Sequence, residues 1–403
     1  MTFRPTLLFY CQHAMGMGHL VRSLALADVL SGSFRVVLLN GGELPSCLSL
    51  PREVEVIDLP PLRLKDGQLI SCDNHYSVVQ AQDKRLDQIL SVFRRLSPEV
   101  LLIELYPFGR RKFEFELLPL LEEAKTQHLF APLIVCSLRD ILVSGRRNEQ
   151  THEERIVFAA NRWFDAILVH SDPGFARLED SFHPRTRISP LVHHTGFVVG
   201  SRRKLPRDRS SSGPIVVSAG GGHYGFQLLS TAIEAHALLS QTEPLTMKLV
   251  AGPLLPEEQW KDLRVASDGR RGVTLVRSVP DLYSELSRAR ASISQCGYNT
   301  AMEIVQAQVP ALVVPFADRG EDEQLRRAQR LEALGAVRVL EQKEITAKRM
   351  ADEIRNLINF QPRTPHLNFD GARQSTEILT ELLKRRRLIQ GSHAAEELVR
   401  CLA

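Results

Sequence analysis

Short apolar runs alternate with stretches of helical periodicity along most of the chain. Such runs predict buried strands of a parallel sheet, and the stretches between them predict helices that cover both faces of that sheet. The predicted strands of the first half are Leu7–Cys11, Arg35–Leu39, Val54–Leu59, Val100–Glu104, Leu133–Ser137 and Ala166–His170. Those of the second half are Ile215–Ser218, Met247–Ala251, Val273–Val276, Ala291–Ser294, Ala311–Pro315 and Val337–Leu340. The pattern therefore predicts an α/β chain with two Rossmann-like parallel-sheet domains facing each other across a cleft.

The division between the two predicted domains lies in a charged segment without apolar periodicity. Residues 201–213 read S-R-R-K-L-P-R-D-R-S-S-S-G, which is typical of a linker. A chain of 403 residues is also too long for one ordinary core. We therefore predict a first domain over 1–200, a second over 214–370, and a final helix within 371–403 that packs back on the first domain.

Glycine-rich turns follow the first strand of each predicted domain. Gly16–Gly18 precede His19 at the start of a helix, and Gly220–Gly222 precede His223 in the same arrangement. Glycines let a ligand approach the backbone, and a helix N-terminus favours an anion. A third turn, Gln295–Thr300, also joins a strand to a helix. Because ligands of open α/β sheets bind at the carboxyl ends of strands, these turns are the predicted binding site.

Composition narrows the class of protein. The net charge of +4 is small for this length, and it argues against a nucleic-acid-binding protein. The basic runs Arg110–Lys112, Arg202–Lys204 and Lys384–Arg387 are expected to be solvated faces or linkers. Six scattered cysteines, at 11, 47, 72, 136, 296 and 401, lack zinc spacing and suggest a reducing compartment. Without a signal peptide or an apolar span, the protein is expected to be cytoplasmic.

The second half carries a longer pattern that resembles a known family. Ser294–Glu303, Pro310–Phe316, Glu323–Gln324 and Leu334–Ala336 follow one another in an order and spacing similar to the donor domain of GT-B glycosyltransferases of family 28. This family includes the peptidoglycan GlcNAc-transferase. The turn that ends in His19 is similar to the first loop of the same family, and the resemblance is thinnest over 41–200.

The resemblance implies a site for a nucleotide-sugar donor. The residues that it assigns to the donor are Gly18, Gly220, Gly221, Gly222, His223, Val279, Gly297, Asn299, Thr300, Glu303, Glu323 and Gln324. It implies that Glu303 binds the ribose, since a carboxylate accepts from both hydroxyls, and that Glu323 and Gln324 bind the sugar. The alternatives are structural. Glu303 could be an ordinary carboxylate of the first helical turn that the helix dipole favours, and Glu323 could belong to the solvated run Glu321–Glu323.

The resemblance further implies inverting transfer of a sugar from a UDP-sugar. No D-x-D pair is present, so the diphosphate is expected to be stabilised by helix N-termini without a metal, and no cofactor is predicted. His19 is the candidate base that deprotonates the acceptor, and His13 on the same loop is the second candidate. A lone histidine on a loop can equally be structural.

The acceptor stays open. Leu105–Phe113 and Ser137–Asp140 depart from the peptidoglycan enzyme, so a small-molecule and a lipid-linked acceptor are both considered. Tyr106–Phe115 could touch a lipid-linked acceptor at a membrane, but we favour an ordinary solvated surface there. Two other functions remain possible: a nucleotide-sugar hydrolase of the pseudaminic-acid pathway type, suggested by G-x-G-H-x-x-R, and a non-catalytic nucleotide-sugar-binding protein.

Overall fold

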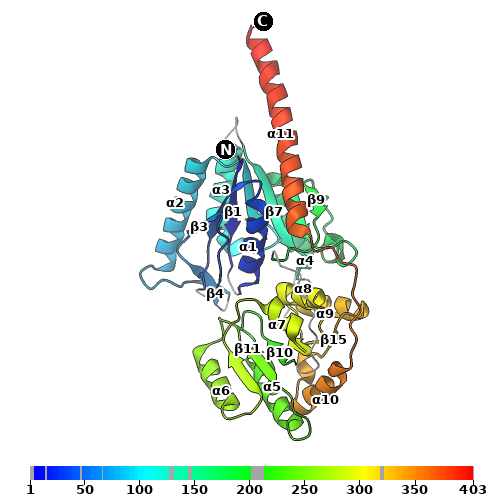
Figure 1. Ribbon diagram of the computed structural model, residues 1–403. Helices are drawn as coiled ribbons and strands as arrows, with labels where there is room; N and C mark the ends of the chain where they lie inside the picture. Colours follow the sequence, from blue (N-terminus) through cyan, green and yellow to red (C-terminus); the bar gives the residue numbers. More distant parts are fainter. Residues whose placement is uncertain are drawn as a thin grey trace.

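The computed structural model describes residues 4–13, 16–45, 48–65, 67–126, 131–143, 148–200, 213–317 and 322–402, with side chains described as far as Leu388. Residues 201–212 of the predicted linker lie outside this range. Figure 1 shows two α/β bodies, one above the other, with one long helix running beside the upper body. Both the N-terminus and the C-terminus lie on the side of the upper body that faces away from the lower one.

The first body is built on a parallel sheet that has seven strands among the described residues, in the order β3-β2-β1-β6-β7-β8-β9. Its central strands are runs of Val, Ile and Leu that are buried on both faces, as a parallel sheet between helices requires. The order reverses between β1 and β6. The strands are β1 (Thr6–Cys11), β2 (Arg35–Asn40), β3 (Val54–Asp58), β6 (Val100–Glu104), β7 (Leu133–Arg139), β8 (Ala166–His170) and β9 (Leu191–His194).

The second body repeats this architecture with six strands among the described residues, in the order β12-β11-β10-β13-β14-β15. All of their pairings are parallel, and the order reverses between β10 and β13. The strands are β10 (Ile215–Ser218), β11 (Met247–Val250), β12 (Val273–Val276), β13 (Ala291–Ser294), β14 (Ala311–Val313) and β15 (Arg338–Val339). The predicted fold class, two Rossmann-like parallel sheets, is confirmed.

Helices cover both faces of each sheet. Those of the first body are α1 (Gly18–Leu30), α2 (Val78–Leu96), α3 (Glu114–Thr126) and α4 (Glu149–Trp163), with 3-10 turns η1 (Arg111–Phe113) and η2 (Leu178–Asp180). Those of the second are α5 (Phe226–Leu239), α6 (Glu257–Ser267), α7 (Leu282–Arg288), α8 (Tyr298–Ala307), α9 (Glu323–Ala333) and α10 (Ala347–Ile358), with η3 (Gln342–Glu344). None of the helices in the described part of the chain has both the length and the apolar character needed to cross a bilayer.

The last helix, α11 (Gly371–Leu402), belongs spatially to the first body (Figure 1). Its side chains Ala372, Leu379 and Leu383 are buried in the apolar cluster that α1 forms with the first sheet. The chain therefore crosses twice between the bodies. At the second crossing, the backbone N–H of Phe197 donates to the carbonyl of Asn368 at 2.7 Å.

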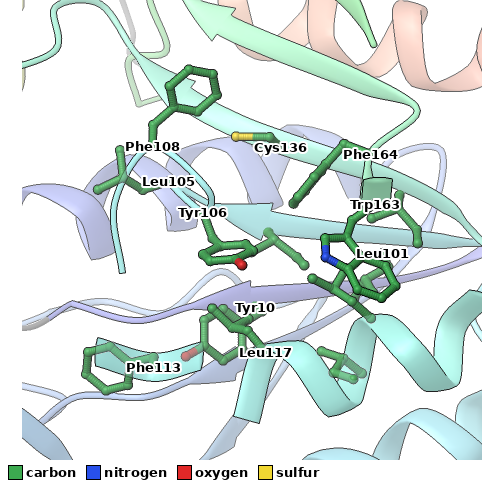
Figure 2. Close-up of a cluster of buried hydrophobic side chains, with 14 of the residues drawn as sticks. Tyr10, Leu101, Leu105, Tyr106, Phe108, Phe113, Leu117, Cys136, Trp163 and Phe164 are labelled. Carbon is green, nitrogen blue, oxygen red and sulfur yellow. The ribbon is translucent and has the colours of Figure 1, made fainter. Parts of the chain in front are cut away.

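The aromatic stretch after β6 forms core rather than surface. Figure 2 shows Tyr106, Phe108 and Phe113 among the buried side chains of the first body. Burying each of these rings stabilises the fold by roughly 1.5–3 kcal/mol, so they are not available to a membrane. The expectation of a solvated surface over Tyr106–Phe115 is therefore wrong for these aromatic residues. Phe108 also stacks edge-on against Phe182, with ring centroids 5.2 Å apart.

The sequence pattern missed three strands. Besides β9 at the edge of the first sheet, these are β4 (Leu62–Lys65) and β5 (Gln68–Ser71), which pair antiparallel as a separate hairpin. Both hairpin strands mix polar with apolar residues, and apart from the buried Leu62 their residues are half-buried or exposed. They therefore lack the continuous apolar run that identified the buried strands.

Candidate active site between the two sheets

Three glycine-containing turns come together where the two bodies meet. The Asn299 side chain at the start of α8 donates to the carbonyl of Gly18 at 3.1 Å, which joins the second body to the first. A Cβ on Gly221 would lie 3.8 Å from the backbone nitrogen of Met17, and one on Gly220 would lie 3.9 Å from the Thr300 hydroxyl. The predicted donor residues Gly18, Gly220, Gly221, Asn299 and Thr300 are therefore neighbours in space.

Glycine is required in the turn after β10. Gly222 has φ +93°, and a Cβ there would lie 2.5 Å from the carbonyl oxygen of Ala251. The turn therefore lies close against the next strand end and leads into the N-terminus of α5. Gly297 is the N-cap of α8, and a Cβ there would have no neighbour within 4 Å. Both helices present unpaired N–H groups, which suit the oxygens of a diphosphate.

His19 lies in the first turn of α1, directly beside a buried carboxylate. Its Nδ1 contacts the Oε1 of Glu104, the last residue of β6. The fold explains this pairing, because β6 is hydrogen-bonded to β1 at the point where the strand order reverses. A carboxylate only accepts hydrogen bonds, so the neutral imidazole donates from Nδ1 and keeps its lone pair on Nε2.

Two arginines hold the same carboxylate. Arg22 donates to Oε1 of Glu104 at 2.8 Å, and Arg110 donates to Oε2 at 3.1 Å. Burial alone would raise the pKa of Glu104, but His19, Arg110 and Arg22 lower it well below its ordinary value. Burial is the largest effect on His19 and lowers its pKa to about 3, although the Glu104 carboxylate opposes this change. His19 is therefore neutral near pH 7 and able to accept a proton.

A cavity of about 260 Å³ opens beside His19. One wall is apolar and includes Phe108 and Phe182, and the rest carries charged groups from both bodies. The volume is slightly below the usual range for a small-molecule pocket, so it fits a small molecule or one end of a larger molecule. The lining residues are His19, Leu105, Phe108, Gly109, Arg110, Arg139, Leu142, Val143, Glu149, His152, Glu153, Ile156, Ser181, Phe182 and Glu323.

His13 does not line this cavity. Its side chain is buried, and its Nε2 is hydrogen-bonded to Oδ1 of Asn40 at 3.1 Å. The ring also packs on Gly42, where a Cβ would lie 2.5 Å from it. Burial lowers the pKa of His13 as it does for His19. The geometry therefore favours His19 as the base and gives His13 a structural position.

The two predicted sugar-binding residues at the start of α9 differ in their contacts. Glu323 lines the cavity and forms an ion pair with Arg139 of the first body, whose Nη1 donates to Oε1 at 2.7 Å. Gln324 uses its side-chain oxygen to accept from the backbone N–H groups of Cys296 and Phe316, at 3.1 and 3.2 Å. A sugar could therefore reach only the amide N–H donors of Gln324.

The other predicted donor residues spread over the carboxyl end of the second sheet. Glu303 is buried on α8, where its i, i+3 and i, i+4 spacing places it on the same face as Thr300 and Asn299. Val279 is half-buried in the segment between β12 and α7. His223 is exposed, and its ring meets that of Tyr224 edge-on, with centroids 4.7 Å apart. Among the described residues, no three His, Cys, Asp or Glu side chains form a group able to hold a metal.

Sequence reasoning missed Glu104, Arg22, Arg110 and Arg139. Arg110 was assigned to a solvated basic run, but its side chain is only 11% exposed and is ion-paired with Glu104, so that expectation is wrong. Only the strand order, which brings residues 85 positions apart into contact, places Glu104 beside His19. An acidic residue that ends a buried strand next to the first strand is the signal that could have found it.

Two Rossmann-like bodies with a site at the carboxyl ends of both sheets define the GT-B fold. Comparison with known proteins agrees. The crystal structure of Acinetobacter baumannii MurG has a TM-score of 0.57 at 15% identity and covers 94% of this chain and 100% of its own. CalG4, the calicheamicin glycosyltransferase, has a TM-score of 0.58 at 15% identity and covers 99% of this chain and 98% of its own.

Sequence comparison shows which proteins the second body resembles. Residues 216–383 match the model of the glycosyltransferase family 28 C-terminal domain. A relative from Paramagnetospirillum magneticum, UDP-N-acetylglucosamine--N-acetylmuramyl-(pentapeptide) pyrophosphoryl-undecaprenol N-acetylglucosamine transferase, is 28% identical over 213 residues. This match covers 51% of the present chain and 56% of the relative, so it spans only about half of each. The chain therefore has the GT-B fold, and its second body resembles the C-terminal domain of family 28 glycosyltransferases.

Proposed function

We propose that the protein is an inverting glycosyltransferase that moves a sugar from a UDP-sugar to an acceptor hydroxyl or amine. The observation that carries this proposal is His19, a neutral imidazole held at Nδ1 by Glu104 and placed in a cavity beside the glycine turns. The match of residues 216–383 to a family 28 domain supports a nucleotide-sugar as the donor. The name of the relative, which contains UDP-N-acetylglucosamine, supports UDP as the nucleotide.

The reaction uses the two bodies for different tasks. The acceptor oxygen or nitrogen attacks the anomeric carbon while its proton passes to Nε2 of His19. The bond from that carbon to the diphosphate oxygen breaks, and UDP leaves with the electron pair. Attack from the side opposite the leaving group inverts the anomeric configuration. The imidazolium that forms is stabilised by the Glu104 carboxylate.

Backbone groups take the role that a metal has in other transferases. The turn at Gly220–Gly222 and the N-termini of α5 and α8 offer N–H groups to the diphosphate, which needs no reorganisation as negative charge develops. In this proposal Glu303 binds the ribose, and Glu323 with Gln324 binds the sugar. Transfer then needs no divalent cation.

The cavity beside His19 is the proposed acceptor site. Its apolar wall, which includes Phe108 and Phe182, suits a hydrophobic group, and its charged part suits a hydroxyl or amine close to His19. We favour a small, partly apolar acceptor, because the volume of about 260 Å³ holds little more. A lipid-linked acceptor, like the undecaprenol compound in the name of the relative, would place only its reacting end here. We also propose that the protein acts in the cytoplasm, where UDP-sugars are available.

Product analysis tests the proposal. The protein is incubated with UDP-GlcNAc or UDP-glucose, with and without a panel of small phenols, alcohols and amines, and the products are separated by mass spectrometry. A sugar conjugate that forms only when protein, donor and acceptor are all present supports transfer. Free sugar with no conjugate would mean hydrolysis, and binding of UDP-sugar without any product would mean a non-catalytic protein.

A further inference from the structure

Helix α9 is held on the first body by two adjacent ion pairs of opposite polarity. Arg139, the last residue of β7, faces Glu323 of α9, and Asp140, the next residue, faces Arg327. Arg327 binds Asp140 with two hydrogen bonds, from Nε at 2.7 Å and from Nη2 at 2.8 Å. Arg139 binds Glu323 through both guanidinium Nη atoms, one to each carboxylate oxygen.

The charge pattern favours the observed register of α9 on the end of β7. Glu323 and Arg327 are four residues apart, so they lie on the same face of α9. Arg139 and Asp140 are neighbours in the chain and carry opposite charges. Moving the helix by one turn would bring like charges together, and like charges are unfavourable at such short distances.

The Arg327–Asp140 pair makes this contact rigid. Both side chains are completely buried, and Arg327 also donates from Nη1 to the carbonyl of Cys296 at 2.8 Å. Separating a buried pair leaves uncompensated charges, which is strongly unfavourable. The start of α9 is therefore fixed next to Arg139, and Arg139 and Glu323 both line the cavity that contains His19.

We propose that Arg139 is a positioning residue for the donor sugar: from the first body, it fixes the Glu323 carboxylate in the plane in which that carboxylate accepts sugar hydroxyls. The proposal rests on the proposed function of this site. A carboxylate has about four lone-pair sites, and Arg139 takes up the side that faces it, with a hydrogen bond at Oε1 and an ion-pair contact at Oε2. The remaining lone-pair sites are available to sugar hydroxyls. Sugar recognition by the second body then depends on a residue of the first body.

Calorimetry on the full-length protein tests this role with three probes: UDP, UDP-GlcNAc and UDP-glucose. Arg139→Met removes the fork but keeps most of the side-chain volume. It should weaken binding of the UDP-sugar that the wild type prefers by about 10-fold, because the Glu323 carboxylate is no longer fixed. It should leave the affinity for UDP within about twofold, since UDP lacks the sugar. Glu323→Gln should give a similar loss, and the double variant should lose no more than either single one.

Two further variants separate positioning from structure. Arg139→Lys keeps the charge without the fork, so it should restore only part of the affinity for the UDP-sugar. Asp180→Asn is the matched control, because it removes the charge from another ion pair of α9 with the first body, to Arg330 at 3.0 Å, and Asp180 does not line the cavity. It should leave both affinities unchanged. If Arg139→Met does not fold, the Lys variant and Glu323→Gln carry the test.

The inference is overturned if the Arg139 variants keep the wild-type ratio of UDP-sugar to UDP affinity. It is equally overturned if they weaken UDP as much as UDP-sugar, or if Asp180→Asn has the same effect, since both results would mean a general role in domain contact. A wild type that binds neither UDP nor a UDP-sugar would contradict the proposed function itself, and this result is distinct from a failure of Arg139.

Discussion

Replacing Glu104 with glutamine removes the negative charge that faces His19 while keeping the shape of the side chain. In the wild type, this completely buried carboxylate contacts Nδ1 of His19, and it accepts from Arg22 and Arg110 at 2.8 and 3.1 Å. In the proposed reaction His19 takes the proton of the acceptor, and the Glu104 carboxylate compensates its new positive charge. In Glu104→Gln, the imidazolium would form next to two arginines without that compensation.

The size of the effect follows from Coulomb's law. Two unit charges about 4 Å apart attract by ~4 kcal/mol at an effective dielectric constant of about 20. With half of the proton charge taken as transferred in the transition state, the loss there is ~2 kcal/mol, which corresponds to a decrease in kcat of about 30-fold. The affinity for UDP should change little, because the hydrogen-bond partners of Glu104 are His19, Arg22 and Arg110 of the first body, and not the second-body turns proposed to bind the diphosphate. The variant should also be less stable by ~3 kcal/mol or more, because Arg22 and Arg110 lose their partner.

Glu116→Gln is the matched control for this loss of stability. Glu116 is also completely buried in the first body and is paired with Arg85 through both guanidinium Nε and Nη2, but it does not line the cavity. Urea unfolding should show a comparable destabilisation of both variants, whereas kcat of the folded protein should fall only for Glu104→Gln. A Glu104→Gln variant with kcat within about threefold of wild type, or a Glu116→Gln variant that loses as much, would refute the reasoning.

Three other predictions follow from the same site. Because burial lowers the pKa of His19 to about 3, its ring stays neutral well below pH 6.5. The pH profile of kcat/KM should therefore show no decrease on the acidic side near pH 6.5. A decrease there that His19→Ala abolishes would contradict this. Glu303→Ala should weaken UDP binding by about 1–3 kcal/mol in calorimetry, and an unchanged affinity would remove Glu303 from the site. Activity should persist in EDTA, and complete loss that Mg²⁺ or Mn²⁺ restores would show that the diphosphate needs a metal.

The free energy of unfolding of the first body should depend on pH through His19 and Glu104, and the direction follows from their pKa values. His19 binds a proton less readily in the folded than in the unfolded protein, so its contribution is lost as pH falls below about 6.5, its ordinary value. The lowered pKa of Glu104 acts in the same direction, and its contribution is lost at still lower pH. Both contributions therefore make the first body less stable as the pH falls.

Local patterns were sufficient to predict the parallel sheets and the glycine turns. Buried parallel strands need continuous apolar runs, and glycines between such a run and a helix are typical of a strand-to-helix turn in an open α/β sheet. The edge strand β9 (Leu191–His194) and the β4–β5 hairpin were missed because they are partly exposed and contain polar residues, so they have no continuous apolar run. These segments form strands because of the neighbouring strands with which they pair, and the residues of each segment alone do not show that pairing.

The partners of the site residues could not be predicted in the same way. His19 was identifiable from its turn, but Glu104 reads in sequence as the end of an apolar run. Arg110 reads as part of a solvated basic run, whereas the backbone at Leu105 and Arg110 has positive φ, 68° and 64°, and the side chain of Arg110 reaches Glu104. Arg139 meets Glu323 across 184 positions in the chain. Such pairs are set by the order of strands and by the contact between the two bodies.

The most direct test of the account compares His19→Ala with the wild type in two measurements on the same preparations, kcat for sugar transfer and calorimetric affinity for UDP. The account predicts that kcat falls by about 100-fold or more, as for loss of a general base, while the UDP affinity stays within about twofold. His13→Ala, the control on the same loop, should lower the melting temperature and leave kcat of the folded protein nearly intact. Turnover of His19→Ala within a few-fold of the wild type would contradict the central claim.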